Sequence, residues 1–230
     1  AFGIIFIGLC FFLSSTIATT GFDLSYWQGD VSESSFECLA QNGYTFGVIE
    51  ATHASEPELN PYIASVVANA KKYIENVDIY IFPDTNYDAS SLIGGYITDL
   101  INDGVLTTNM VWFDIEQNGD TWSSSCSTNQ SWLNEAIETV NNMYKGCGLS
   151  SCVGIYSGES QWSPIMCNTS EFSHYPLWWA YYDNDPSFSD FTPFGGWTTP
   201  SIKQYKGTTY ICDTAIDEDW YQGRVLLIKS

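Results

Sequence analysis

Residues 110–116 read MVWFDIE, a short apolar segment that ends in two carboxylates. Its apolar, aromatic and β-branched residues are typical of a strand buried on both faces of a parallel sheet. Side chains two positions apart on a strand point to the same side, with Cα atoms roughly 6.6 Å apart, so Asp114 and Glu116 are expected to project together. Two neighbouring carboxylates compete for charge, which raises the pKa of one and leaves the other ionised. Acid catalysis beside a charged carboxylate needs that division of roles.

Outside this segment, short apolar runs alternate with helix-like stretches. We expect strands at residues 21–25, 45–51, 77–82, 110–116, 152–156, 177–181, 201–205 and 214–218, and helices at 32–41, 59–75, 90–102 and 131–145. This alternation predicts an α/β fold, a single (β/α) barrel of about eight strands. The last three strands lack helices between them, so the second half is expected to be irregular. A doubly wound sheet is the alternative, and without a GxGxxG or P-loop motif nucleotide chemistry has no support.

The first 18 residues differ in kind from the rest. Residues 2–13 form a nearly unbroken apolar run, and the small residue Ala18 follows at a plausible cleavage point. This pattern is typical of a secretory signal peptide, whereas a membrane anchor needs about 20 apolar residues. We therefore expect a signal peptide at 1–18 and one barrel domain at 19–230. No linker or repeat indicates a further module.

Cysteine usage agrees with secretion. Six cysteines follow the predicted signal, namely Cys38, Cys126, Cys147, Cys152, Cys167 and Cys212. Disulfides are the default in secreted proteins, and six cysteines allow 15 pairings, of which the sequence favours only the local pair Cys147–Cys152. Zinc is the alternative, but with two His residues and no CxxC pair we expect neither a metal nor another cofactor. Asn129 and Asn168 each begin a glycosylation sequon.

The formal charge is −20, from 7 basic and 27 acidic residues. Such a charge argues against nucleic acid and anionic membranes as partners. We expect a monomer with no membrane anchor once the signal is removed.

Four carboxylates fall at or near strand ends of the predicted barrel. Asp114 and Glu116 close the fourth strand, Asp23 lies in the first, and Asp217 lies in the last. In βα barrels, catalytic residues sit at the C-terminal ends of the strands. The first and last strands of a closed barrel are neighbours, so Asp217 is expected to reach Asp23.

At this point the chain resembles the lysozymes of glycoside hydrolase family 25, the Ch-type muramidases. Six segments carry the resemblance in order: the opening GFDLSYWQGDVS at 21–32, WFDIE at 112–116, GIYS at 154–157, LWWAY at 177–181, KQY at 203–205 and ID at 216–217. Together they cover nearly the whole chain after the predicted signal.

The resemblance implies a flattened βα barrel that hydrolyses the β-1,4 bond between N-acetylmuramic acid and N-acetylglucosamine in peptidoglycan. It implies Glu116 as proton donor and Asp114 as the group that orients the substrate's own acetamido group for attack. Asp23 and Asp217 would complete the acidic pocket. The glycan strands of peptidoglycan would be the partner. Carboxylate spacing alone does not decide between inversion, retention and substrate assistance.

One segment departs from the family pattern. The family's second strand commonly ends Lys-Ala-Thr-Glu-Gly, but residues 50–54 here read EATHA. A binding role is therefore not carried over to Glu50. His53 at this strand end is either a substrate contact or a hydrogen-bonded structural residue.

Aromatic residues make up 16% of the chain, and most are expected in the core. Those near strand ends could instead line a groove in which sugar rings stack on their faces. The candidates are Tyr26, Trp27, Tyr80, Phe82, Tyr156, Trp178 and Tyr205.

Two other functions stay open. A chitinase-like hydrolase of N-acetylglucosamine polymers would use similar chemistry, although the Asp-x-x-Asp-x-Asp-x-Glu run expected there is absent. A non-catalytic glycan-binding protein could keep the same barrel. The strong negative charge also predicts repulsion from anionic cell walls at neutral pH, which favours action in an acidic compartment such as a gut, lysosome or phagosome.

Overall fold

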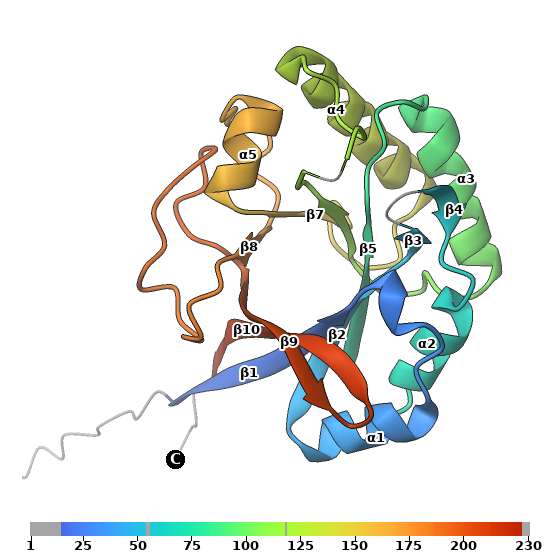
Figure 1. Ribbon diagram of the computed structural model, residues 1–230, viewed down its shortest axis with the longest axis vertical. Coiled ribbons are helices and arrows are strands. Elements are labelled where there is room, and N and C mark those ends of the chain that lie inside the picture. The colour runs from blue at the N-terminus through green and yellow to red at the C-terminus, as the bar shows by residue number, and fades with distance from the viewer. Residues whose placement is uncertain (1–14, 54–55, 118, 227–230) are drawn as a thin grey trace, which may run out of the picture.

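The computed structural model describes residues 15–53, 56–117 and 119–226, which form a closed barrel of eight strands (Figure 1). The barrel strands are β1 (Ser15–Leu24), β2 (Tyr44–Glu50), β5 (Asn76–Ile81), β6 (Val111–Asp114), β7 (Val153–Ser157), β8 (Leu177–Ala180), β9 (Ile202–Ile211) and β10 (Thr214–Leu226). Their order around the barrel is β1-β10-β9-β8-β7-β6-β5-β2. The predicted eight-stranded barrel is confirmed, and the doubly wound sheet is excluded.

One strand runs against the others. Strands β1, β2, β5, β6, β7, β8 and β9 pair in parallel in turn, whereas β10 is antiparallel to both β9 and β1. The cause is the short connection between β9 and β10, because a two-residue turn can join only antiparallel strands. Its residues, Cys212 and Asp213, have φ values of 55° and 59°, as a type I′ hairpin turn requires. Both strands are longer than the sequence predicted.

Five helices surround the parallel part of the barrel (Figure 1). They are α1 (Glu33–Gln41), α2 (Ile63–Ala70), α3 (Ala89–Asn102), α4 (Cys126–Met143) and α5 (Glu159–Met166). Three of these helices begin at an N-cap side chain, which accepts the backbone N–H of the residue three positions further along the chain. The N-caps are Ser32 for α1, Asp88 for α3 and Ser125 for α4. No helix lies between β8 and β9 or between β9 and β10, as the irregular second half predicted. None of the helices in the described part of the chain is long and apolar enough to cross a bilayer.

The sequence misplaced several elements. The helix expected at 59–75 is only α2, and a small hairpin of β3 (Thr52–His53) and β4 (Glu56–Leu59) precedes it. Helix α5 was not expected, because Pro164 lies inside it and proline usually breaks a helix. Buried Trp162, Ile165 and Met166 hold α5 against the barrel. Residues 1–14 of the predicted signal peptide lie outside the described residues, and residues 15–18 form the beginning of β1. The signal peptide therefore stays a prediction.

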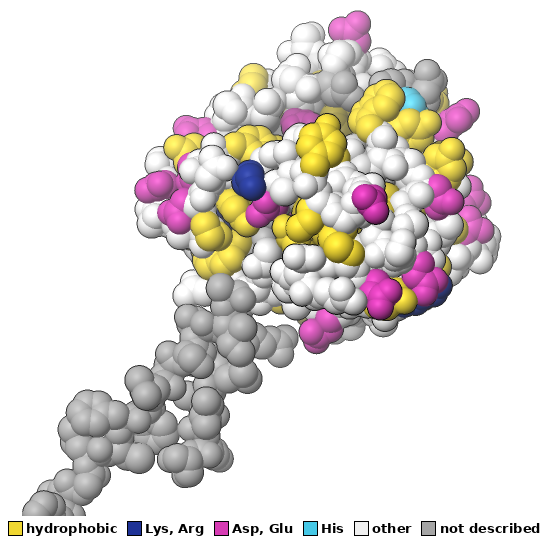
Figure 2. Space-filling view, turned by 60° about the horizontal axis from the view of Figure 1, so that its bottom comes forward, with side chains coloured by type: hydrophobic (Ala, Val, Ile, Leu, Met, Phe, Trp, Pro, Cys, Tyr) yellow, Lys and Arg dark blue, Asp and Glu magenta, His cyan; other side chains and the backbone are white. Residues whose placement is uncertain are grey.

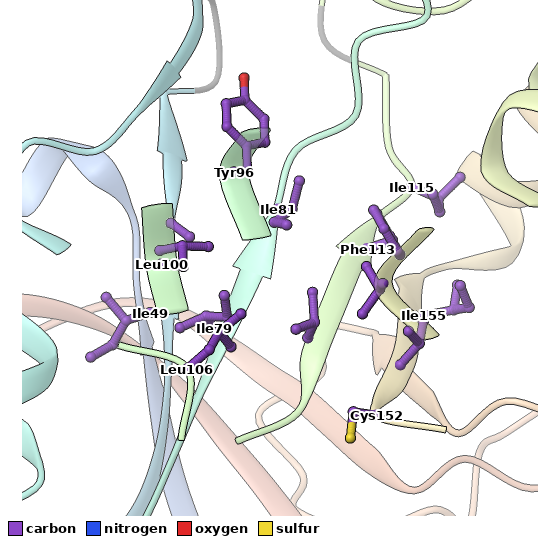
Figure 3. Close-up of a cluster of buried hydrophobic side chains, with 14 of the residues drawn as sticks. Ile49, Ile79, Ile81, Tyr96, Leu100, Leu106, Phe113, Ile115, Cys152 and Ile155 are labelled. Atoms are coloured by element: carbon purple, nitrogen blue, oxygen red, sulfur yellow. The ribbon is translucent and has the colours of Figure 1, made fainter. Parts of the chain in front are cut away.

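The core has two layers because strand side chains alternate between inside and outside. The inner layer fills the barrel with Phe46, Val48, Tyr80, Trp112, Tyr156, Trp178 and Ile202. The outer layer lies between strands and helices. Figure 3 shows part of it, with Ile49, Ile79, Ile81, Phe113, Ile115 and Ile155 in the same cluster as Tyr96 and Leu100 of α3.

Two glycines make room for the large rings inside the barrel. A Cβ on Gly21 would lie 2.3 Å from the ring of Phe46, and a Cβ on Gly154 would lie 2.3 Å from the ring of Trp112. Such distances are far below van der Waals contact, so both positions exclude any side chain.

Three disulfides link the described cysteines. They join Cys147 to Cys152, Cys38 to Cys212 and Cys126 to Cys167. The favoured local pair is therefore confirmed. The two sequons differ in access. Asn129 is buried, and its amide donates to the carbonyls of Ser123 and Ile165, so a glycan there is incompatible with this fold. Asn168 is exposed.

Gly154→Ala should destabilise the barrel, because its Cβ overlaps Trp112 inside a packed interior. We expect a loss of about 2 kcal/mol or more in the free energy of unfolding, measured by chemical denaturation. The matched control is Gly95→Ala on the exposed face of α3, where a Cβ meets nothing within 4 Å. There the better helix propensity of alanine should raise stability by about 0.5–1 kcal/mol. Equal effects of the two substitutions would contradict this account of the interior.

Candidate active site

The mouth of the barrel holds a pocket of about 310 Å³ with an acidic lining. All four predicted acids line it: Asp23, Asp114, Glu116 and Asp217. Five further lining residues are the predicted aromatics Trp27, Tyr80, Phe82, Tyr156 and Trp178. The remaining lining residues are Ser25, Glu50, Gln117, Tyr182 and Gln204, so none of the residues around the pocket is Lys, Arg or His.

The four acids reach this mouth from both ends of the chain. Asp23 lies at the end of β1, Asp114 ends β6, and Glu116 follows two residues later. Asp217 lies near the N-terminal end of β10, whereas the prediction placed it near the C-terminal end of the last strand. It still reaches the mouth because β10 is antiparallel, and the register pairs Asp23 with Asp217 directly.

Neighbouring residues fix the loop that carries Glu116. The indole Nε1 of Trp122 donates to the Glu116 carbonyl at 2.7 Å, and the next amide, of Gln117, donates to Gln161 Oε1 at 2.9 Å. One residue earlier, the Ile115 carbonyl accepts the Ser157 hydroxyl at 2.8 Å. Glu116 thus lies outside regular structure but on a constrained backbone.

Gln204 is the hydrogen-bonding centre of the pocket, and the sequence did not single it out. Its Nε2 donates to Asp23 Oδ2 at 2.6 Å and to Asp217 Oδ2 at 3.2 Å. Its Oε1 accepts the hydroxyls of Tyr156 and Tyr182, each at 2.6 Å. One amide therefore orients two carboxylates and two phenols. The available signal was its place in the KQY segment at 203–205, to which no role was given. In the structure, strand alternation turns Gln204 inward between its two outward neighbours on β9.

Glu50 is a second pocket residue to which the sequence gave no role. Its Oε2 accepts the Tyr26 backbone N–H at 2.7 Å and the Tyr80 hydroxyl at 3.1 Å, while its Oε1 has no donor among the described residues. Burial raises the pKa of Glu50 to about 7, and the charge of Glu116 adds to the effect. The position where the family pattern breaks is therefore part of the pocket wall.

Burial also raises the pKa of every catalytic candidate. For Asp114, desolvation raises the pKa well above the usual range, followed by the charges of Glu116, Glu50 and Asp23. For Glu116, desolvation comes first and the charge of Asp217 second. Burial therefore raises the pKa of both members of the Asp114–Glu116 pair, and the expectation that one of them stays ionised remains a prediction.

A sixth carboxyl lies deeper in the barrel. Asp219 is fully buried, and its Oδ1 accepts the Trp178 indole N–H at 2.7 Å, while its Oδ2 has no hydrogen-bond partner among the described residues. Burial first, and then the charge of Asp23, raise its pKa well above the usual range. Burial first, and then the charge of Asp217, likewise raise the pKa of Asp23 well above its usual range, while the hydrogen bond from Gln204 lowers it.

Three predicted substrate contacts lie away from the pocket. Tyr205 donates its hydroxyl to Glu218 at 2.6 Å on the outer side of β9, because alternation turns Gln204 inward instead. The rings of Tyr26 and His53 pack on each other with centroids 4.1 Å apart, and both contact Trp27. Tyr26 and His53 therefore pack against Trp27 and do not line the pocket.

Chemically, this arrangement places an accessible acid with a raised pKa, Glu116, beside further carboxyl groups in a pocket whose lining residues include no Lys, Arg or His. Glu116 is half-buried, whereas Asp114 is buried and its Oδ1 has no hydrogen-bond donor among the described residues. An acid can therefore protonate a leaving oxygen while Asp114 accepts an N–H from the same ligand.

Glu50→Gln should change how stability depends on pH. An unfolded glutamate loses its proton near pH 4.5, whereas Glu50 in the folded protein loses it near 7. The folded state thus binds more protons between these values, so its stability falls as pH rises across them. Glutamine stays neutral, and we expect the variant to exceed the wild type by about 3 kcal/mol at about pH 8, with little gain at about pH 4.

Chemical denaturation at both pH values checks this expectation. Glu135→Gln on the exposed face of α4 is the control, and its effect should be close to zero at both. A Glu50→Gln variant whose gain does not depend on pH would contradict the raised pKa.

Known proteins resemble this chain in sequence and in fold. The family model described as Lysozyme-like protein 1 matches residues 16–205. Probable GH family 25 lysozyme 2 from Dictyostelium discoideum is 37% identical over 188 residues, which cover 81% of this chain and 84% of that protein. Counting factor 50 from the same organism is 40% identical over 198 residues, but they span only 62% of its length and 83% of this chain. The solved structure of a family GH25 lysozyme from Aspergillus fumigatus has a TM-score of 0.71 at 22% identity, covering 90% of this chain and 95% of that one.

Proposed function

The chain belongs to glycoside hydrolase family 25, the lysozymes, and from this premise we propose that it cleaves the β-1,4 bond between N-acetylmuramic acid and N-acetylglucosamine in bacterial peptidoglycan. The observation that carries the proposal is the convergence of Asp23, Asp114, Glu116 and Asp217 on one pocket. A protein that only bound glycans would have no use for an accessible proton donor beside a buried carboxyl.

In this proposal Glu116 donates its proton to the glycosidic oxygen. The bond between that oxygen and the anomeric carbon breaks, and the leaving sugar keeps the electron pair. The acetamido carbonyl oxygen of the remaining sugar then bonds to the anomeric carbon. Water next bonds to the same carbon, the bond to the acetamido oxygen breaks, and the proton that water loses returns to the Glu116 carboxylate. Asp114 supports the acetamido step because its Oδ1 has no donor in the described part of the chain and can accept the acetamido N–H.

Asp217 and Asp23 have supporting roles in this proposal, one through the pKa of Glu116 and both as acceptors of sugar hydroxyls. Burial first, and the charge of Asp217 second, raise the pKa of Glu116, which favours the protonated form of the donor. Gln204 holds Asp23 and Asp217 on the opposite wall, where their oxygens can accept sugar hydroxyls. The faces of Tyr80, Tyr156 and Trp178 form the apolar part of the pocket wall.

The place of action in this proposal is outside the cell or in a lysosomal or phagosomal lumen. Three disulfides support an oxidising environment. The charge of −20 supports an acidic one, because protonation of carboxylates weakens repulsion from anionic walls. On the face drawn in Figure 2, Asp and Glu are spread widely over the surface and Lys and Arg are sparse.

Glu116→Gln is the direct test. It keeps the shape and removes the proton, so turnover of purified peptidoglycan should fall by about two orders of magnitude or more. The readout is muropeptide analysis, in which a new reducing end on N-acetylmuramic acid identifies the bond cleaved. Glu135→Gln, on the exposed face of α4, should retain full activity. Wild-type turnover by Glu116→Gln would remove Glu116 from the donor role, and cleavage of chitin oligomers without peptidoglycan cleavage would overturn the proposed substrate.

The pH profile tests the role of Asp217. Activity requires a protonated Glu116, so kcat/KM should fall as pH rises through its raised pKa. Asp217→Asn removes a negative charge that raises this pKa, and the alkaline limb should therefore move to lower pH. Asp99→Asn, exposed on α3, should leave the limb in place. If the alkaline limb of the Asp217→Asn profile stays at the wild-type pH, Asp217 does not control the pKa of Glu116.

A further inference from the structure

A second hollow, of about 620 Å³, lies beside the catalytic pocket at the tip of the β9–β10 hairpin. One side is formed by Trp27 and Gln28, which follow β1, and the other by hairpin residues 210–215. Trp27 also lines the catalytic pocket. The two hollows therefore meet at one side chain.

A third and smaller hollow, of about 150 Å³, joins them along a second line. It shares Asp23, Ser25 and Asp217 with the catalytic pocket. It shares Gln28 and Ala215 with the hairpin hollow. The three hollows therefore adjoin one another from the catalytic acids to the hairpin tip. We call the second and third hollows together the hairpin groove.

The outer part of the hairpin groove has two unusually exposed aromatic side chains. Trp27 is 72% exposed and Tyr210 is 83% exposed, more than any other large hydrophobic residue in the described part of the chain. Broad aromatic faces left in water at a concave site are typical of a binding surface. Asp213 is the sole charged side chain among the residues that line this outer hollow, so no Lys or Arg there could pair with the phosphates of a nucleic acid.

Both sides of the hairpin groove are held in place without a ligand. The Cys38–Cys212 disulfide ties the hairpin tip to α1. Trp27 lies in the short 3-10 turn Tyr26–Gln28, where Gln28 Oε1 accepts the Ser25 N–H at 2.7 Å. The rings of Tyr26 and His53 pack against Trp27 with centroids 5.5 and 5.9 Å away. A surface fixed in this way loses little conformational entropy on binding.

We propose that the hairpin groove binds the continuation of the glycan strand beyond the sugars at the cleaved bond, with N-acetylhexosamine rings stacked on Trp27 and Tyr210. This proposal rests on the proposed function, because it takes the strand to enter from the catalytic pocket. Aromatic faces suit the C–H faces of sugar rings, while Gln28, Asp213 and Thr214 provide polar groups for their hydroxyls. The groove makes the enzyme prefer long strands to short fragments.

The test compares long peptidoglycan glycan strands with a tetrasaccharide fragment, using kcat/KM for each. Tyr210→Ala should lower the ratio of long-strand to tetrasaccharide kcat/KM about five- to tenfold, mainly through KM. Tyr210→Phe keeps the ring and should restore the ratio. Tyr87→Ala is the matched control, because Tyr87 is 46% exposed and does not line the groove. A wild-type ratio in Tyr210→Ala, or an equal loss in Tyr210→Phe, would overturn the proposal.

A binding measurement separates this proposal from the proposed function. Titration calorimetry with the same long strands should show weaker binding to Tyr210→Ala than to the wild type, each combined with Glu116→Gln to prevent turnover. If the wild type cleaves neither substrate, the proposed function fails, and this measurement still decides the groove. Equal binding by the two proteins would refute the groove even if the wild type cleaves peptidoglycan.

Discussion

The reversal of β10 is the constraint on which the rest of the structure depends. Seven parallel strands leave two open edges, and β10 closes the gap by pairing antiparallel with β9 on one side and β1 on the other. Closure satisfies backbone groups that an edge would leave exposed. Because β10 starts at the catalytic mouth, it delivers Asp217 to the pocket and Asp219 to the interior beneath it. The same hairpin places Tyr210 beside the pocket entrance.

The second constraint is a cluster of acids that no cation neutralises. Among the described residues, the three ion pairs lie elsewhere, at Lys72, Lys203 and Lys206. The acids of the pocket are instead held by an amide, hydroxyls, an indole and backbone N–H groups. A charged amine would strongly favour the ionised carboxylate over the neutral acid. These uncharged partners favour the ionised form less strongly. Desolvation therefore dominates, and it raises the pKa values of the whole cluster.

Local patterns predicted the strand positions and the four acids, because apolar runs and strand-end carboxylates are visible in the sequence alone. The direction of β10 was not visible, since strand pairing is a long-range property. Gln204 and Tyr205 show the same limit: adjacent residues have opposite roles, and only the register of β9 decides which faces the pocket. Glu50 was set aside because it departs from a family pattern, although its position on β2 gave the better indication. Helix α5 was missed because packing of Trp162 overrides the local effect of Pro164.

The Cys38–Cys212 disulfide encloses most of the chain, because its two cysteines lie 174 positions apart in the sequence. Asp114 and Glu116 lie inside this covalent ring, while Asp23 and Asp217 lie just outside it on the two arms. A single proteolytic cut anywhere within the ring would leave both pieces attached to one another, with all four acids on one molecule. In a compartment rich in proteases, a nicked chain would thus keep its active site together for as long as the barrel packing holds.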